Sequence, residues 1–283
     1  MKTYIEISIS ANKTQQELLI PTMIEIGCHG FEERDNELLC YIDKSLWTDE
    51  KYDRLKSDLK KLLQTISSNS IIKISEIQET NWNAEWEKTI TPIEVGKKLV
   101  IKPSWREYDK KEEKILIQID PKMSFGTGYH ETTRLTLQLL EKYIKNGDKV
   151  LDIGTGTGIL AIAAIKLGAN SALGIDNDEW ALENANENIQ ANHLLNKIKI
   201  SNQALNEINE KFDLITANIM LTTIVDMLPE IERKLKDKGI VLFSGLLLED
   251  EEKFKEAIKK HSIKILEKVS ENEWLAFATQ KLN

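Results

Sequence analysis

The sequence predicts an α/β fold, in which a mainly parallel sheet is covered by helices on both faces and is preceded by a smaller α+β unit. Two features carry this prediction. From about residue 130 onward, helix-like stretches alternate with short apolar, strand-like runs. Ahead of them, residues 1–79 follow another order, with two consecutive strands between two helices. At 283 residues the chain is long enough for two domains, each with its own core.

The amino-terminal unit, residues 1–79, is predicted to be a ferredoxin-like α+β domain, because its elements follow the order β-α-β-β-α-β. Pro21 is expected to kink or end the first helix. The unit is acidic and lacks the aromatic-basic pattern of RNA-binding relatives, so we expect it to recognise a protein substrate. Its predicted strands are 4–9, 31–34, 38–42 and 71–77, and its predicted helices are 14–26 and 49–66.

Residues 80–105 are predicted to form a tryptophan-rich linker to the larger domain, residues 106–283. Trp82, Trp86 and Trp105 lie in this segment. Trp82 and Trp86 are four residues apart and would share one face of a helix. Packing between the domains is the favoured interpretation of these side chains. Contact with a substrate is the alternative, and we retain all three as candidate substrate-binding residues.

The larger domain is predicted to hold a seven-stranded sheet with crossover helices. Its predicted strands are 149–153, 171–176, 198–200, 212–217, 239–243, 263–269 and 274–279. Its predicted helices are 131–145, 158–167, 178–192, 221–236 and 249–260. The last two strands are joined by a short turn, and this closing hairpin places one antiparallel strand on the sheet.

A glycine-rich turn, GTGTG, joins the first strand of this sheet to the next helix. Gly154, Gly156 and Gly158 let the backbone approach a ligand closely, since any Cβ there would collide with it. A dinucleotide fingerprint would need glycine at position 159, which is Ile159, and a P-loop would need a Gly-Lys pair, which is absent. The spacing therefore predicts a nucleoside-like cofactor without a pyrophosphate.

Two polar residues end strands at the same edge of the predicted sheet. Asp176 follows Gly154 by twenty-two residues and is expected to accept hydrogen bonds from two ribose hydroxyls. Its alternative role is a helix cap, which Asp178 would fill better. Asn218 ends a later strand, where its short side chain offers one acceptor and one donor near the reacting group. Its alternative role is also a helix cap.

The stretch FGTGYHETT, residues 125–133, is a second glycine-threonine loop. It has no lysine and no preceding Rossmann-type strand, so it does not match a phosphate-binding loop. We expect it to close over one end of the cofactor, with Phe125 as a candidate substrate-binding residue. His130 and Glu131 are candidates for a general base by position, and His130 could equally stabilise the loop.

Several stretches in fixed order resemble the PrmA family of bacterial ribosomal protein L11 lysine methyltransferases over about residues 80–220. Tyr129 and Met220 depart from the family's usual residues in these stretches, though both are conservative in shape. The matching stretches are WNAEWEK, PIEVGKKLVIKPSW, DPKMSFGTGYHETTRLTL, LDIGTGTGILAIAAIKLGA, GIDNDEWALENANENIQAN and DLITANIM.

The resemblance implies a Rossmann-like class I methyltransferase domain that uses S-adenosylmethionine. It implies that Thr133, Gly154, Asp176 and Asn218 contact this cofactor. Thr133 starts a predicted helix, and a helix amino terminus favours an anion such as the methionine carboxylate; simple capping is the alternative. The implied acceptors are lysine side chains and the α-amino group of ribosomal protein L11.

Three other functions stay open from the residues. The acceptor could be another protein lysine or a small amine, or the chain could be a non-catalytic, ribosome-associated module that binds the cofactor. A dinucleotide oxidoreductase fits less well, because Ile159 and the closing hairpin disfavour it.

Composition limits the partners and the location. The net charge of −8 argues against nucleic-acid binding and suits a basic protein partner. The sequence begins without a signal peptide, has no membrane-spanning run and holds two cysteines, Cys28 and Cys40, so we expect a cytoplasmic protein with reduced thiols. We also expect a monomer. The four histidines match no metal-ligand spacing, and we expect no metal site.

Overall fold

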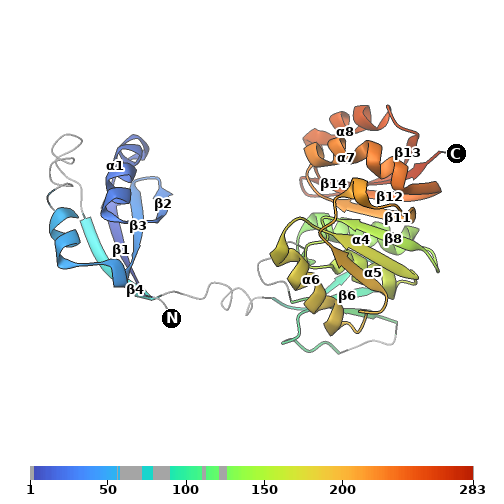
Figure 1. Cartoon of the computed structure of the whole chain (residues 1–283), viewed down its shortest axis with the longest axis horizontal. Coiled ribbons are helices and arrows are strands. Elements are labelled where there is room, and N and C mark those ends of the chain that lie inside the picture. The colour runs from blue at the N-terminus through green and yellow to red at the C-terminus, as the bar shows by residue number, and fades with distance from the viewer. Residues whose placement is uncertain are drawn as a thin grey trace. The chain divides into compact units, whose positions relative to one another are not determined.

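The computed structural model describes residues 3–55, 57, 72–78, 90–109, 113–120 and 126–282. The chain divides into two compact units, Met1–Trp86 and Glu87–Asn283 (Figure 1).

The first unit is an antiparallel sheet with a helix on one face. The strands β1 (Thr3–Ser10), β2 (Gly30–Arg34), β3 (Glu37–Asp43) and β4 (Ile72–Gln78) pair in the order β2-β3-β1-β4. The helix α1 (Lys13–Ile26) continues past Pro21 and ends at Gly27, and a short 3₁₀ helix, η1 (Lys44–Leu46), follows β3.

The core of this unit consists of apolar side chains from β1, α1 and β3, and it includes the unpaired, buried Cys28 and Cys40. Residues 49–55 are helical as predicted. The remainder of the predicted second helix lies largely outside the described residues, so the ferredoxin-like assignment stays a prediction.

The second unit begins with a small sheet that sequence patterns did not predict. Strands β5 (Ile93–Val95), β6 (Leu99–Lys102) and β7 (Ile115–Gln118) pair in the order β5-β6-β7, with β6 and β7 parallel. Residues 93–102 of the predicted linker therefore lie in or between strands of the second unit. The domain boundaries inferred from sequence remain a prediction.

The main sheet of the second unit has seven strands in the order β10-β9-β8-β11-β12-β14-β13. The strand β14 runs antiparallel to both of its neighbours, which is the predicted effect of the closing hairpin. The predicted α/β fold is thus confirmed. The strands are β8 (Lys149–Ile153), β9 (Ser171–Ile175), β10 (Ile198–Ser201), β11 (Phe212–Asn218), β12 (Leu235–Leu247), β13 (Ile263–Glu271) and β14 (Trp274–Lys281).

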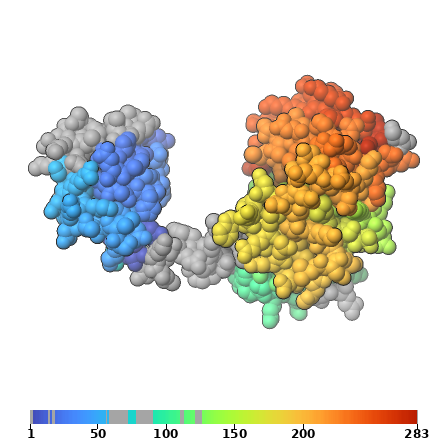
Figure 2. Space-filling view, viewed as in Figure 1, coloured from blue at the N-terminus to red at the C-terminus, as the bar shows by residue number. Residues whose placement is uncertain are grey.

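Helices cover both faces of this sheet. One face packs against α4 (Glu131–Tyr143), α5 (Ile159–Lys166) and α6 (Glu179–Ala191), which share a core with the small sheet. The other packs against α7 (Leu221–Lys234) and α8 (Glu251–Ile258). In its core Phe254 stacks on Phe277 and meets Phe243 edge to face. Figure 2 shows these last elements, coloured orange to red, as one continuous surface of the unit.

The chain reverses its direction of travel across the sheet between β8 and β11. From β8 it continues outward to β9 and β10, and it then returns to form β11 on the other side of β8. Ligands of open α/β sheets bind outside the carboxyl ends of the strands at such a switch point. Here those ends lead into Gly154 and finish at Asn218.

Candidate active site

The turn after β8 is a glycine loop with little room for side chains. Gly154, Gly156 and Gly158 have φ values of 69°, 53° and 80°, which favour glycine. A Cβ on Gly154 would lie 2.6 Å from the Cγ2 atom of Ile219. The loop can therefore present its backbone to a ligand, and alanine at position 154 would not fit without a shift.

Asp152, in β8, forms a hydrogen bond with this loop and is fully buried. Its two oxygens accept hydrogen bonds from the hydroxyls of Thr155 at 2.7 Å and Thr216 at 2.6 Å. Burial raises the pKa of Asp152 to about 6, although these hydrogen bonds act in the opposite direction. Asp152 therefore organises the loop from within the sheet.

Asp176 is tied to the glycine loop by its own carboxylate. One oxygen accepts from the backbone N–H of Gly156 at 2.9 Å, and the other from the backbone N–H of Asp178 at 3.1 Å. Asp178 in turn caps α6 by accepting from the N–H of Trp180, as the sequence predicted. Each oxygen of Asp176 keeps a further lone pair for a ligand.

A cavity of about 310 Å³ opens beside Asp176. Its lining comes from the carboxyl ends of β8 and β9, the segment after β10 and the start of α7. The residues are Ile153, Gly154, Ile175, Asp176, Asn177, Asn202, Gln203, Ala204, Leu205, Ile219, Thr223 and Met227.

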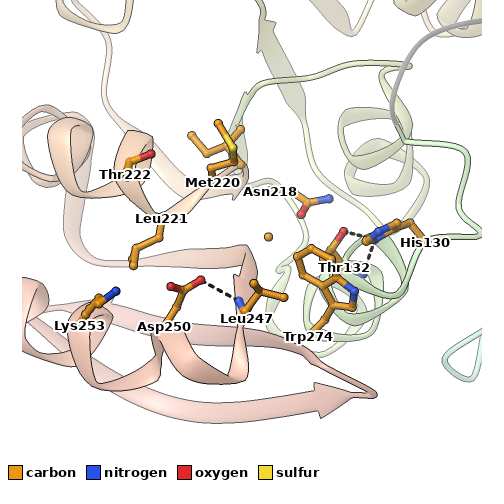
Figure 3. Close-up of a pocket in the computed structure, with 12 residues that line it drawn as sticks. His130, Thr132, Asn218, Met220, Leu221, Thr222, Leu247, Asp250, Lys253 and Trp274 are labelled. Carbon is orange, nitrogen blue, oxygen red and sulfur yellow. Dashed lines mark hydrogen bonds between the residues drawn. The ribbon is translucent and has the colours of Figure 1, made fainter. Parts of the chain in front are cut away.

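A second cavity of about 610 Å³ lies beyond Ile219, which lines both. Figure 3 shows Trp274 and the His130–Thr132 pair on one side and Met220 and Leu221 on the other. The complete lining is His130, Thr132, Asn218, Ile219, Met220, Leu221, Thr222, Gly245, Leu247, Asp250, Lys253 and Trp274. Asn218 lines the larger cavity alone and directly precedes Ile219, the residue that the two cavities share.

Two buried polar atoms in this region have no hydrogen-bond partner among the described residues. They are Oδ1 of Asn218 and Oγ1 of Thr133, and Thr133 is 0% exposed. Buried polar groups in native proteins are nearly always paired with protein, water or a ligand, so these two atoms are available to a bound ligand. Thr133 adjoins Thr132 of the larger cavity, and both atoms match residues predicted to contact a cofactor.

His130 caps the helix α4, a role that the sequence left open. Its Nδ1 accepts from the backbone N–H of Thr132 at 3.3 Å and lies 2.9 Å from the Thr132 hydroxyl. The imidazole also meets the ring of Trp274 edge-on, with centroids 4.9 Å apart. Since His130 is the cap, capping does not account for Thr133.

The two glycine-threonine loops are joined directly. The hydroxyl of Thr157 donates to the carbonyl of Gly126 at 2.6 Å. A Cβ on Gly126 would lie 2.8 Å from that hydroxyl oxygen, so glycine allows the close approach. Farther along the second loop, the Tyr129 hydroxyl donates to the carbonyl of Thr91.

Of the remaining predicted site residues, the structure describes Trp105 alone. Trp105 is 41% exposed and lines neither cavity. Trp82, Trp86 and Phe125 fall outside the described residues. Sequence reasoning missed Trp274, which starts the antiparallel strand β14.

It also missed Leu247, which ends β12, and Asp250 and Lys253, which follow that strand. The position of Leu247 at the carboxyl end of a strand was a usable signal.

Comparison with known proteins decides the family. The sequence model described as "Ribosomal protein L11 methyltransferase (PrmA)" matches residues 3–282. The chain belongs to the ribosomal protein L11 methyltransferase family. Its relatives in this family include the enzyme of Chlorobaculum parvum, 37% identical over 99% of this chain and 97% of the relative. The enzyme of Caldicellulosiruptor bescii is 34% identical over 98% and 99% of the two chains.

A solved structure of this family shares the fold. The ribosomal protein L11 methylase of Lactobacillus delbrueckii subsp. bulgaricus matches with a TM-score of 0.65 and 33% identity, over 69% of this chain and 100% of that one. As a member of the L11 methyltransferase family, the protein is a methyltransferase whose methyl donor is S-adenosylmethionine. The glycine loop, with its positive φ values and the tight space at Gly154, and the two unpaired polar atoms suit a donor that carries a nucleoside and a charged amino-acid end.

Among the residues that the structure describes, no helix is both long and apolar enough to cross a membrane. Nor do three His, Cys, Asp or Glu residues among them gather closely enough to hold a metal ion.

Proposed function

We propose that this L11 methyltransferase transfers methyl groups from S-adenosylmethionine to lysine side chains and the α-amino group of ribosomal protein L11. The observation that carries the proposal is the buried, unpaired Oδ1 of Asn218, which lines the larger cavity next to Ile219, the residue shared with the smaller cavity. Membership of the family supports the acceptor. The enzyme would act as a cytoplasmic monomer on this basic protein, without binding nucleic acid itself.

The smaller cavity would hold the nucleoside part of the methyl donor. Asp176 would accept hydrogen bonds from the ribose hydroxyls, as its remaining lone pairs allow. The backbone of Gly154, Gly156 and Gly158 would form the floor of the site. Thr133, whose hydroxyl is buried and unpaired at the start of α4, would bind the carboxylate of the methionine part.

The larger cavity would receive the acceptor amine. An ammonium group must lose its proton before it can attack, which costs about 4–5 kcal/mol at neutral pH for an unperturbed lysine. Met220, Leu247 and Trp274 provide apolar walls that disfavour the charged form and so lower the cost. Asn218 would orient the neutral amine by accepting an N–H bond at Oδ1. When bound, the donor supplies an electrophilic methyl group, and the protein's main task is alignment.

The roles of the other candidates follow from their positions. His130 remains a proposed catalytic group. Because its Nδ1 accepts from the backbone N–H of Thr132, the neutral ring would carry its proton on Nε2, which could donate a hydrogen bond into the site. Trp82, Trp86, Trp105 and Phe125 remain proposed contacts to the protein substrate. The amino-terminal unit would supply the main recognition surface.

The test is mass spectrometry of L11 after incubation with the enzyme and isotope-labelled S-adenosylmethionine. The proposal expects added methyl groups on lysine side chains and on the α-amino group. A parallel reaction uses a cell lysate with and without added L11. Labelling of another protein or of small amines, with L11 unmodified, would overturn the acceptor, and no transfer to any acceptor would overturn catalysis.

A further inference from the structure

The outer edge of β7 is hydrogen-bonded by asparagine side chains instead of a neighbouring strand. Asn192 donates to the carbonyl of Gln118 at 2.7 Å and accepts from its N–H at 3.1 Å. Two residues on, the N–H of Asp120 donates to Asn188 at 2.9 Å, and its carbonyl accepts from Asn184 at 2.9 Å. The asparagines are spaced by four along α6 and its C-cap, Asn192, so they lie on one face of the helix.

Asn188 differs from the other two because it also reaches the glycine loop. Its Nδ2 donates to the carbonyl of Thr157 at 3.0 Å, while its Oδ1 holds Asp120. The side chain is 2% exposed, and Thr157 is fully buried. Thr157 lies between two glycines with positive φ and itself donates to Gly126. A single amide thus joins the cofactor loop to the end of β7.

We propose that Asn188 is a positioning residue for cofactor binding, which acts by holding the Thr157 carbonyl. The proposal rests on the assignment of the cofactor to the glycine loop. Glycines give the free loop many alternative conformations. If the binding-competent one is populated for a fraction of the time, the dissociation constant rises by the inverse of that fraction. Asn188 raises this fraction without touching the ligand.

A matched pair of variants separates positioning from stability. N188A removes the bonds to Thr157 and Asp120, whereas N192A removes bonds to Gln118 and the backbone of Asn188 but leaves the glycine loop alone. Melting temperature and the affinity for S-adenosylhomocysteine are measured on both purified full-length variants. We expect both to melt lower than wild type, N188A to bind about tenfold more weakly, and N192A to bind like wild type. At saturating donor, N188A should keep its kcat within about twofold.

A third variant, N188D, tests the donor itself and serves if N188A does not fold. Its carboxyl retains an acceptor for Asp120 but sets an oxygen against the Thr157 carbonyl. Binding should be weak at neutral pH and should recover, relative to wild type, as falling pH protonates the carboxyl and restores a donor.

Wild-type affinity in N188A, equal losses in N188A and N192A, or a pH-independent N188D would each overturn the proposal. D176A, measured alongside, distinguishes this result from failure of the cofactor site. If D176A binds like wild type, the site assignment is wrong. If D176A loses binding while N188A does not, the inference alone is wrong.

Discussion

Arg134 at the start of α4 holds Glu271 at the end of β13 through charge-assisted hydrogen bonds of 2.6 and 3.1 Å. The same guanidinium donates to the carbonyl of Tyr129. One turn away, Asn272 donates to Glu131 at 2.9 Å. The tip of the closing hairpin is therefore fastened to the amino terminus of α4. This contact fixes one wall of the larger cavity, where His130, the N-cap of α4, and Trp274 from β14 pack against each other.

Loss of this clamp should slow methyl transfer more than it weakens the fold. In E271A, Arg134 loses its strongest partner and the walls of the acceptor cavity are less well aligned. We expect kcat to fall about tenfold, since small misplacements of reacting groups are costly. The matched control is E267A on the same strand, which loses Lys142 and Tyr143 of the same helix. Both pairs are partly exposed, so each variant should lose about 1 kcal/mol or less. Equal kcat values in the two would contradict this role.

Asp176 should be needed for cofactor affinity, whereas its neighbour Asp178 should be needed for stability alone. D176A should weaken S-adenosylmethionine binding by about a hundredfold, because bonds to a charged group contribute about 1.5–3 kcal/mol each. D178A removes the cap of α6 and should cost about 1 kcal/mol of unfolding free energy. Isothermal calorimetry and urea unfolding measure the two quantities. Unchanged binding in D176A would remove the ribose assignment.

Asp250 should attract the cationic acceptor to the larger cavity. Its carboxylate accepts from the backbone N–H of Leu247 at 3.0 Å, and asparagine would retain that bond while losing the charge. D250N should therefore raise KM for L11 several-fold, most at low salt, with little change in kcat. The control is E252Q on α8, whose exposed carboxylate does not line the cavity. A KM that does not depend on salt, or an equal rise in E252Q, would contradict the prediction.

Asp152 should make the fold less stable as pH rises. Burial raises its pKa in the folded protein from 3.8 to about 6. The folded state then holds a proton that the unfolded state has lost, so this contribution is full below about pH 4 and disappears as pH rises through about 6. At about 1.36 kcal/mol per unit, the effect approaches 3 kcal/mol. D152N should lack this pH dependence. Urea unfolding of wild type and D152N between pH 5 and 7 should show that the difference between their unfolding free energies becomes smaller toward low pH.

Much of the large sheet could be predicted because its strands are apolar runs that end in polar residues. The strand β8 occupies the predicted residues, and Asp176 and Asn218 stand out as polar ends at one edge. By contrast, β12 begins at Leu235 instead of residue 239. Residues 236–238 are all charged, so this part resembles a loop in sequence. Lys238 also has a positive φ, yet Leu235 pairs with Phe212.

The acceptor cavity could not be derived in the same way. Trp274 meets His130 because β14 inserts between β12 and β13, a pairing between segments far apart in the chain. The short strands β5 and β6 in the tryptophan-rich segment could not be identified from sequence, since three or four residues show little periodicity. In the sequence, Asn184, Asn188 and Asn192 resemble ordinary polar surface residues. Their hydrogen bonds to the end of β7 can be recognised only in the structure.

Ile219 lines both cavities, and under the proposed function this shared wall has a consequence for the way the two substrates enter and leave. After each transfer the spent donor must leave and a fresh one must enter. The nucleoside end of the proposed donor would lie on the Asp176 side of Ile219, and the proposed acceptor amine would lie on the Asn218 side. The nucleoside end would therefore have its own route of exchange, separate from the cavity that receives the amine.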